Sequence, residues 1–258
     1  MCESTPPKSP GLKEHHATGL DMAAVESSEA REVRVRYGRR DAKHSLPDRY
    51  SLLNESALMP HLERLHALAR WARESAGPPL SQRHILEVGC GDGANLLDLI
   101  RLGADPRLLT GNELLEGRLS HARERLPRAV RLLPGDATGL ALPTDGFDVV
   151  LQSTVFSSLL DDAFQQRLAD AMWSWVRPGG GVLWYDFTVN NPRNPDVRGV
   201  PLARVRALFP RGTVHARRVT LAPPLARALC RVHPALYTVA NGLPWLRTHV
   251  LAWIAKPA

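Results

Sequence analysis

Short apolar runs alternate with helix-like segments through the middle of the 258-residue chain. Strand-like runs occupy residues 84–89, 107–112, 129–133, 147–152 and 181–187. Apolar positions recur at the three- and four-residue spacing of a helix over residues 93–103, 116–125 and 162–176. This alternation predicts an α/β fold, with a parallel sheet that carries helices on both faces.

The segment before the first strand divides into two parts. Apolar residues recur at helical spacing from Met59 to Ala72, Pro60 suits a first helical turn, and the Gly-Pro-Pro stretch at 77–79 ends the helix. Residues 1–45 are rich in Ser, Pro, Lys, Glu and His with little periodicity, so we expect a largely disordered or loosely packed leader. Residues 46–258 are expected to form a single domain.

The composition is that of an ordinary globular protein, with 44% hydrophobic and 23% charged residues. The first twenty residues lack the apolar core of a secretory signal, and no apolar run approaches the roughly 18 residues of a membrane span. Cys2, Cys90 and Cys230 are scattered, without the spacing of a disulfide framework. We therefore expect a cytoplasmic protein with reduced thiols and no bound metal.

The net charge of +7 is concentrated near the carboxyl terminus. Residues 201–258 hold nine Lys and Arg and no acid, whereas acidic residues outnumber basic ones over residues 46–200. Because the excess is regional, it favours one basic face over a uniformly cationic nucleic-acid binder.

The first strand leads into the glycine-rich stretch ILEVGCGDGANLL at residues 85–97. Gly89-x-Gly91-x-x-Ala94 matches the dinucleotide-binding fingerprint, which leaves a nicotinamide-dependent oxidoreductase as an alternative. Glu87, just before the first glycine, would repel a pyrophosphate and attract an ammonium group. With Gly93, the stretch becomes acid-x-Gly-x-Gly-x-Gly.

This signature resembles that of the class I S-adenosylmethionine (SAM)-dependent methyltransferases. The resemblance implies a Rossmann-like, seven-stranded, mostly parallel sheet with an antiparallel seventh strand, strands six and seven lying near residues 213–221 and 247–255. It also implies SAM as cofactor and S-adenosylhomocysteine as product. By this likeness, residues of the glycine-rich turn line the methionine part of SAM, namely Glu87, Gly89, Cys90, Gly91 and Gly93.

Further cofactor contacts follow from the same resemblance. Glu113 at the end of strand two would hold the ribose hydroxyls, with Leu114 on the adenine face. In the Gly-Asp-Ala context after strand three, Asp136 and Ala137 would bind the adenine base. Three residues outside these turns complete the predicted set: Gln152 at the methionine end, Phe156 beside the methyl group, and Tyr50 covering the cofactor.

The stretch NNPRNPDVRGVP at residues 190–201 is the most unusual in the chain. Together with the preceding WYDF segment it resembles a bacterial subgroup of type 11/12-like methyltransferases. Asn191, Arg193 and Arg198 are expected to shape the acceptor pocket, the arginines pairing with a phosphate or carboxylate. The alternative is a rigid loop pinned by its own side chains, since Asn and Asp often bond their own backbone.

Residues 222–246 form a helical, basic and apolar insert that is expected to close the acceptor site by packing against the sheet. The alternative is peripheral contact with a membrane surface, which basic amphipathic segments also make.

A hydroxyl acceptor would need a general base. The candidates are His249, Asp186 and Tyr185, of which His249 has the suitable ordinary pKa. Strand alternation puts Tyr185 and Asp186 on opposite sides of the sheet, which argues against their working as a pair.

The favoured interpretation is a SAM-dependent methyltransferase that acts on a small molecule or glycan-type acceptor, most readily at oxygen. An RNA or protein methyltransferase remains as an alternative because the carboxyl-terminal region is basic. The chain lacks the Asn/Asp-Pro-Pro-aromatic tetrad after strand four, which argues against a nucleic-acid partner. A non-catalytic partner protein with this fold is opposed by the intact acids. The sequence leaves the oligomeric state open.

Overall fold

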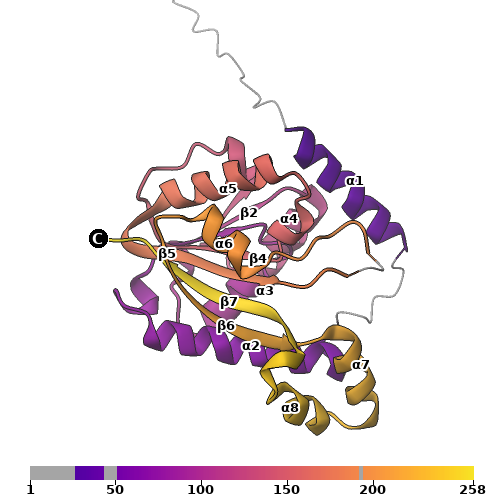
Figure 1. The fold of residues 1–258 in the computed structure, drawn as a ribbon. Helices are drawn as coiled ribbons and strands as arrows, with labels where there is room; N and C mark the ends of the chain where they lie inside the picture. The colour runs from indigo at the N-terminus through magenta and orange to yellow at the C-terminus, as the bar shows by residue number, and fades with distance from the viewer. Residues whose placement is uncertain (1–26, 44–50, 192–193) are drawn as a thin grey trace, which may run out of the picture.

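The computed structural model describes residues 27–43, 51–191 and 194–258, and the side chains of all of these except 40–43. A seven-stranded sheet with the order β3-β2-β1-β4-β5-β7-β6 lies at its centre (Figure 1). The strands are β1 (Ile85–Val88), β2 (Leu109–Glu113), β3 (Arg131–Pro134), β4 (Phe147–Ser153), β5 (Val176–Phe187), β6 (Thr213–Leu221) and β7 (Arg247–Ala255). Neighbouring strands are parallel except that β7 runs antiparallel to β5 and β6. The predicted fold class is confirmed, including the antiparallel seventh strand.

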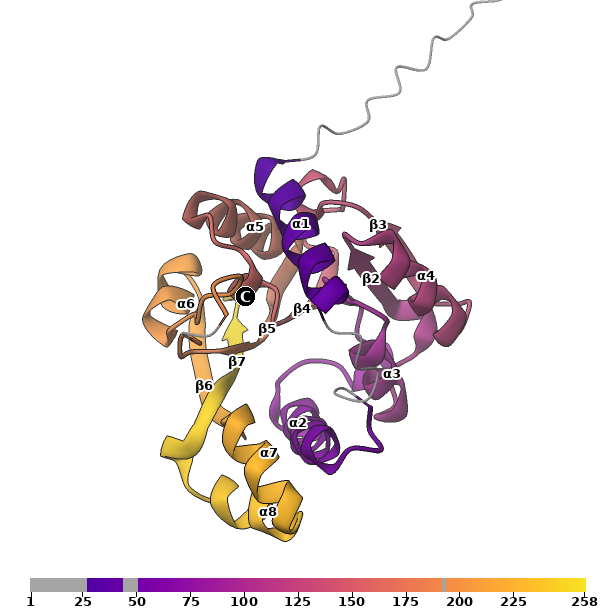
Figure 2. The ribbon, with the colours of Figure 1, turned by 90° about the vertical axis from the view of Figure 1, so that its right-hand side faces the viewer.

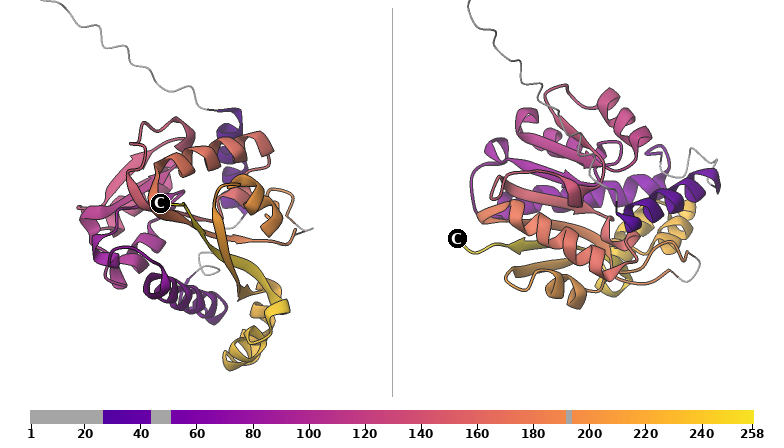
Figure 3. Two further views of the ribbon diagram at one scale, coloured as in Figure 1. Left: turned by 60° about the vertical axis from the view of Figure 1, so that its left-hand side comes forward. Right: turned by 90° about the horizontal axis from the view of Figure 1, so that it is seen from above.

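Helices cover both faces of the sheet (Figures 1 and 3). One face carries α2 (Glu55–Glu74), α3 (Ala94–Arg101) and α4 (Glu116–Arg125), and the other carries α5 (Asp162–Trp175) and α6 (Leu202–Leu208). All four residues of β1 are buried, as expected for a central strand covered on both sides. Trp184 of β5 is the largest fully buried side chain, and its ring lies 4.6 Å from that of Phe156.

Helix α2 begins earlier than the apolar pattern predicts. The Asn54 side chain accepts a hydrogen bond from the Ser56 amide and caps the helix. The helix therefore begins at Glu55, four residues before Met59. Pro60 therefore lies inside the helix instead of in its first turn.

The prediction of a loosely packed leader is wrong for residues 28–43, which form helix α1 (Ser28–Lys43). Figure 2, viewed toward the carboxyl ends of the parallel strands, shows α1 lying across the edge of the sheet. Its Glu29 and Arg36 are only 7% and 6% exposed and pair with each other at 2.5 Å. The buried face thus carries charged residues as well as apolar ones, so hydrophobic periodicity does not reveal the helix.

The insert between β6 and β7 is helical, as predicted, and consists of α7 (Pro223–Val232) and α8 (Ala235–Asn241). The two helices contact α2 and the end of β6. Because β6 is parallel to β1, this insert stands at the same edge of the sheet as α1. Within the described ranges, no helix is both long and apolar enough to cross a membrane.

Packing between β5 and β7 leaves no room for a side chain at Gly181, which pairs with Ala255. A Cβ there would lie 2.5 Å from the Trp253 ring and 2.6 Å from the Ile254 carbonyl oxygen. We expect Gly181→Ala to lower the free energy of unfolding by about 1–3 kcal/mol, because the backbone oxygen cannot move aside. Urea titration measures the change.

Gly117 provides the matched control, because it is exposed on α4 and a Cβ there would meet nothing within 4 Å. Gly117→Ala should raise the free energy of unfolding by up to about 1 kcal/mol, through helix propensity. Equal effects of the two substitutions would contradict this description of the β5–β7 packing.

Candidate active site

A cavity of about 250 Å³ lies where β1, β2 and β4 end, beneath α1. Such an edge is where open α/β sheets bind their ligands. The predicted cofactor residues that line it are Gly89, Cys90, Gly91, Glu113, Leu114, Asp136 and Ala137. Three separate turns of the chain therefore meet around one cavity, as the sequence predicts.

The glycine-rich turn brings backbone to the wall of this cavity. Gly89 has φ +67°, and a Cβ there would lie 2.5 Å from Val155 Cγ2, so both the conformation and the space require glycine. Gly93 differs from the prediction, because it does not line the cavity. It is the N-cap of α3 at φ +83°, packed against the side chain of Leu126.

Glu113 joins the turn after β2 to the glycine-rich turn. One carboxylate oxygen accepts a 2.8 Å hydrogen bond from the Gly91 amide, and the other accepts a 2.8 Å bond from the Leu115 amide. The side chain is only 6% exposed yet lines the cavity. Each oxygen retains a lone pair that a ligand hydroxyl could use.

Asp136 lines the cavity next to the start of α1. One of its oxygens accepts hydrogen bonds from the amide and hydroxyl of Thr138, and the other accepts a 2.7 Å bond from the Ser27 hydroxyl. The apolar side chains around this end belong to one hydrophobic cluster: Val33, Leu114, Ala137, Phe164 and Leu168. This combination of one acceptor and apolar walls suits a flat heterocycle with an exocyclic amino group.

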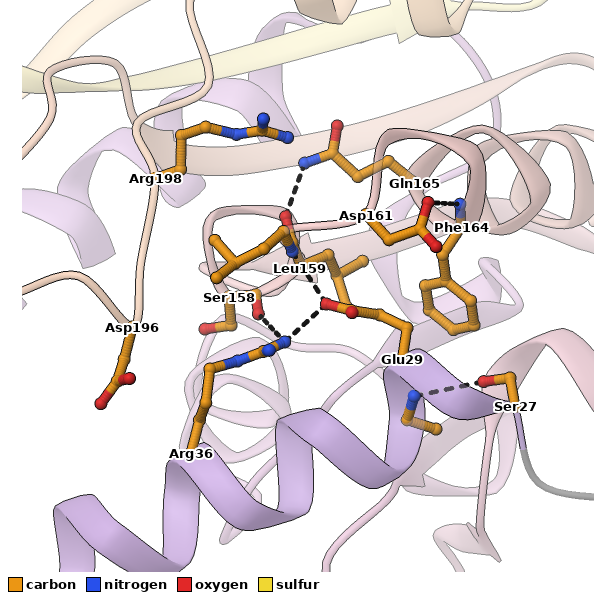
Figure 4. Close-up of polar contacts among 12 residues, drawn as sticks. Ser27, Glu29, Arg36, Ser158, Leu159, Asp161, Phe164, Gln165, Asp196 and Arg198 are labelled. Carbon is orange, nitrogen blue, oxygen red and sulfur yellow. Dashed lines mark hydrogen bonds and ion pairs between the residues drawn. The ribbon is translucent and has the colours of Figure 1, made fainter.

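Helix α1 is held over the cavity by polar contacts near its start and at its middle (Figure 4). Glu29 accepts a 2.8 Å hydrogen bond from the Leu160 amide, and Arg36 donates a 3.1 Å bond to the Ser158 carbonyl oxygen. The Tyr37 ring also faces the guanidinium of Arg118 at 4.4 Å. Ala30, Val33 and Tyr37 therefore form a wall of the cavity that was not predicted.

Glu87 lies beneath the glycine-rich turn and is fully buried. Asn95 donates a 2.6 Å hydrogen bond to one carboxyl oxygen, while the other oxygen has no hydrogen-bond partner. Burial raises the pKa of Glu87 to about 8, although the Asn95 hydrogen bond and the charge of Arg64 oppose the shift. Near neutral pH the carboxyl group is therefore largely protonated, and a cation that reaches its free oxygen would displace the proton. Glu87 itself does not line the cavity.

Comparison with known proteins agrees with this geometry. Residues 85–180 match the family described as "Methyltransferase domain". Residues 85–180 form a class I SAM-dependent methyltransferase domain.

Solved structures with the same fold include a SAM-dependent methyltransferase from Mesorhizobium loti. It is 18% identical, with a TM-score of 0.54, over 74% of this chain and 100% of that one. A second is the Burkholderia thailandensis 1,6-didemethyltoxoflavin-N1-methyltransferase with bound S-adenosylhomocysteine. It is 14% identical, with a TM-score of 0.58, over 90% of this chain and 92% of that one.

The curated relatives match only part of the chain. A tRNA N(3)-cytidine methyltransferase METTL2 from Bos taurus is 27% identical over 133 residues, which are 48% of this chain and 35% of the relative. The METTL2 proteins of Gallus gallus and Mus musculus are similar at 26% identity. The chain thus spans about a third of the length of the curated relatives it matches.

The residues at the polar end of the cavity fit the amino-acid part of SAM. Arg64 of α2 lines the cavity, and its Nε is buried without a hydrogen-bond partner. Together with the free oxygen of Glu87, it complements a group that carries both a carboxylate and an ammonium. When bound there, SAM supplies a methyl group on a sulfonium centre. Sequence reasoning missed Arg64 because only the packing of α2 brings it to the methyltransferase cavity.

Gln152 and Phe156, which were predicted to contact the cofactor, do not line the cavity. Gln152 and Phe156 are fully buried. The side-chain Oε1 of Gln152 accepts a hydrogen bond from the Val155 amide, and Phe156 packs on Trp184. The cavity wall there is made by backbone and small side chains at Ser153 and Thr154. Tyr50 lies outside the described residues.

The structure separates the three predicted bases. Asp186 is fully buried on the α5 face, where it accepts hydrogen bonds from the amides of Ser157 and Phe187. Burial raises the pKa of Asp186 to about 7 against those hydrogen bonds. The Tyr185 hydroxyl is buried on the other face, 2.9 Å from Thr220 Oγ1, and burial raises its pKa. Neither side chain reaches the cavity, so the prediction of a catalytic role for them is not supported.

His249 of β7 is partly exposed, and its ring stacks on Tyr185 with centroids 5.2 Å apart. Burial lowers the pKa of His249 to about 4, and the positive charge of Arg64 acts in the same direction. The imidazole is therefore neutral at physiological pH and able to accept a proton.

The predicted acceptor loop is pinned by its own contacts. Arg198 pairs with Asp162 of α5, and its amide donates to the Ser157 carbonyl oxygen. Asn190 accepts a 2.8 Å hydrogen bond from the Gly199 amide. Arg198 lines a separate cavity of about 520 Å³ between the loop, α5 and α6, away from the cofactor residues. The structure thus favours the alternative of a rigid loop over an arginine-lined acceptor pocket.

Asn191 lines neither of the two cavities. Asn191 is exposed, and its carbonyl oxygen accepts a hydrogen bond from the Asn194 amide. Arg193 lies outside the described residues.

We expect Glu87→Gln to change the pH dependence of stability. In the wild type the pKa rises from an ordinary value of 4.5 to about 8 on folding, so the unfolded chain releases its proton first and stability falls as pH rises through this window. The neutral amide has no such dependence. Without cofactor, the variant should gain about 3 kcal/mol relative to the wild type between pH 5 and pH 8. Urea titration at both pH values measures this difference.

Glu124→Gln, on the exposed side of α4, is the matched control and should differ from the wild type by a constant amount. SAM should stabilise the wild type more than Glu87→Gln, because only the carboxylate can pair with the ammonium group. A pH-independent difference between Glu87→Gln and the wild type would contradict the described state of Glu87.

Proposed function

We propose that the protein transfers the methyl group of SAM to a hydroxyl oxygen of a small molecule or glycan-type acceptor. The observation that carries the proposal is His249, a neutral imidazole at the edge of the sheet where the cofactor cavity lies, which is termed the cofactor edge below. Arg64 connects the two places, because it lines the cavity and its guanidinium lies 5.7 Å from the Tyr185 ring on which His249 stacks.

The surroundings of His249 suit a base that acts on a neutral hydroxyl. The imidazole Nδ1 lies 3.1 Å from the Thr248 hydroxyl, which holds the ring in place, and Phe187 packs edge-on at 5.8 Å. Arg64 disfavours the imidazolium form, which keeps the imidazole neutral and free to accept a proton near neutral pH. Within the described residues, the cavity carries no cluster of acids and histidines able to hold a metal. In this proposal His249 takes the hydroxyl proton while the acceptor oxygen is aligned with the methyl group.

His249→Gln tests this role. With a hydroxylated acceptor, kcat should fall by about 10²- to 10⁴-fold, because general base catalysis contributes that much. The dissociation constant for SAM should stay within about twofold, since His249 does not line the cofactor cavity. Fixed-time assays with radiolabelled SAM measure the rate, and calorimetry measures the affinity for SAM.

His215→Gln on β6 is the matched control, because this histidine is exposed and pairs with Trp253, far along the strand from His249. The wild-type rate should be flat from about pH 6 to about pH 8 and decline toward the His249 pKa of about 4, where the base becomes protonated. Unchanged turnover in His249→Gln, or a rate that rises steadily above pH 6, would contradict the proposal.

A tRNA substrate is the second candidate, favoured by the similarity to the METTL2 proteins. That similarity covers about half of this chain, and nine basic residues with no acid follow Val200. Several of these charges are engaged within the molecule, since Arg217 pairs with Glu74 and Lys256 pairs with Asp145. This internal pairing weakens the case for a phosphate-binding surface.

Methyl transfer from radiolabelled SAM to bulk tRNA separates the candidates. Under the hydroxyl proposal, label enters hydroxylated small molecules or oligosaccharides and not tRNA. If nuclease digestion shows the label in the cytidine of tRNA, and no label enters the small acceptors, the proposal is overturned in favour of RNA.

A further inference from the structure

Helices α7 and α8 project from the body of the protein as a separate hairpin (Figures 1 and 2). One side of the hairpin packs on a small cluster that includes Ala226, Tyr237 and Leu221. Tyr237 also donates a 2.6 Å hydrogen bond to Glu63 of α2, which fixes α8 to the body. The hairpin is thus held rigidly on its inner side.

The outer side of the hairpin carries apolar side chains that nothing in the described residues covers. Val232, Val239 and Trp245 are 76%, 72% and 72% exposed. Leu236 lies three residues before Val239 on α8 and shares its face of that helix, and Leu243, just after α8, is also exposed. These five residues are termed the hairpin face below. Monomeric soluble proteins seldom leave a row of large apolar side chains in water without a use for it.

A second apolar element lies beside the hairpin. Leu53, just before α2, is 97% exposed, and its neighbour Leu52 is also exposed. Met59 in the first turns of α2 belongs to the cluster under α7, which places this leucine pair next to the hairpin. The exposed apolar surface is therefore built from two segments distant in sequence.

Positive charge surrounds the hairpin face. Residues 201–258 contain no acid, and Arg231 on α7 is exposed beside Val232. Arg247 at the base of the hairpin donates to the carbonyl oxygens of Asn241 and Arg218, so its charge is held close to the hairpin. The acids of α2 nearby are Glu55 and Glu63, and Glu63 is engaged by Tyr237 and the Thr220 amide.

We propose that the hairpin face docks on an anionic phospholipid bilayer. The apolar side chains project from a convex, helical tip, with a tryptophan among them and arginine at the flank, which is the arrangement of interfacial helices. Attraction between arginine and acidic headgroups adds to the burial of the apolar side chains. A protein partner would more commonly be met by a groove or a flat patch.

Docking in this way would place the cofactor edge of the sheet toward the membrane. The hairpin joins the carboxyl end of β6 to the start of β7, and the cofactor cavity lies at the carboxyl ends of β1, β2 and β4. The proposal does not depend on which acceptor is methylated, and it can fail or succeed independently of methyl transfer.

Sedimentation with vesicles tests the proposal with the full chain at low salt. Vesicles of phosphatidylcholine with phosphatidylserine should retain the protein, whereas phosphatidylcholine alone should retain about tenfold less. Val239→Asp should reduce binding to the anionic vesicles by about tenfold or more, because a charge would enter the headgroup boundary. Arg231→Glu should weaken binding to the anionic vesicles and leave the weak binding to neutral ones unchanged.

Thr213→Asp at the start of β6 is the matched control, because Thr213 is exposed and lies at the opposite end of this strand from the hairpin. It should bind vesicles like the wild type. Circular dichroism shows whether each variant is folded, and Trp245 gives a second readout. Its emission should shift to shorter wavelength on addition of anionic vesicles. Trp245→Phe should abolish the shift, because Trp71, Trp173, Trp175 and Trp184 are buried and the half-buried Trp253 packs on Trp71, far along β7 from the hairpin.

Three outcomes would overturn the proposal. The first is no retention by anionic vesicles at low salt. The second is retention that Val239→Asp does not reduce. The third is a dimer in light scattering that Val239→Asp dissociates while vesicles bind neither form, which would assign the hairpin face to a second copy of the chain.

Discussion

The carboxylate of Glu113 is the contact on which the cofactor site depends, because it joins two turns that the sheet alone would not align. Parallel strands end at one edge, but nothing in the ladder of β1 and β2 fixes the turns beyond them. The hydrogen bonds from the amides of Gly91 and Leu115 supply this alignment. A charged acceptor for two backbone amides is stronger than a neutral one, and burial strengthens it further. The glycine-rich turn can then approach a ligand closely without being free to move.

Helix α1 closes the same site from outside. Its buried ion pair between Glu29 and Arg36 is bonded to backbone groups of the turn after β4, and Ser27 is bonded to Asp136. Removing either partner of a buried pair leaves an uncompensated charge, and here the Ser158 carbonyl oxygen and the Leu160 amide add one hydrogen bond to each partner, while Arg36 Nε has none. The contacts that hold α1 over the cavity therefore include Asp136, which is expected to bind the adenine base.

Much of the fold could be predicted because its signals are local. The predicted helix at 116–125 coincides with α4. The acids at or just beyond the ends of β1, β2 and β3 were expected from the resemblance to SAM-dependent methyltransferases. Helix α1 could not be predicted, because its buried face is partly charged. Arg64 could not be assigned either, because it reaches the cavity only through the packing of α2.

The errors have a common physical origin. Gln152, Phe156 and Asp186 lie at or near the carboxyl ends of strands, yet the chain turns so that backbone covers them. A sequence position near the edge of a sheet does not say whether a side chain points into the cavity or beneath it. The loop at 190–201 is rich in groups that could bind a ligand, but those groups bind the loop itself.

The central claim is that this edge of the sheet binds SAM through the buried carboxyl group of Glu87. Calorimetric titration of the full chain with SAM in buffers of different ionisation enthalpy tests it most directly. We predict one SAM per chain, no binding of NAD, and a heat that depends on the buffer near pH 7, because Glu87 must release its proton as the ammonium group binds. Binding of NAD without binding of SAM would contradict the account.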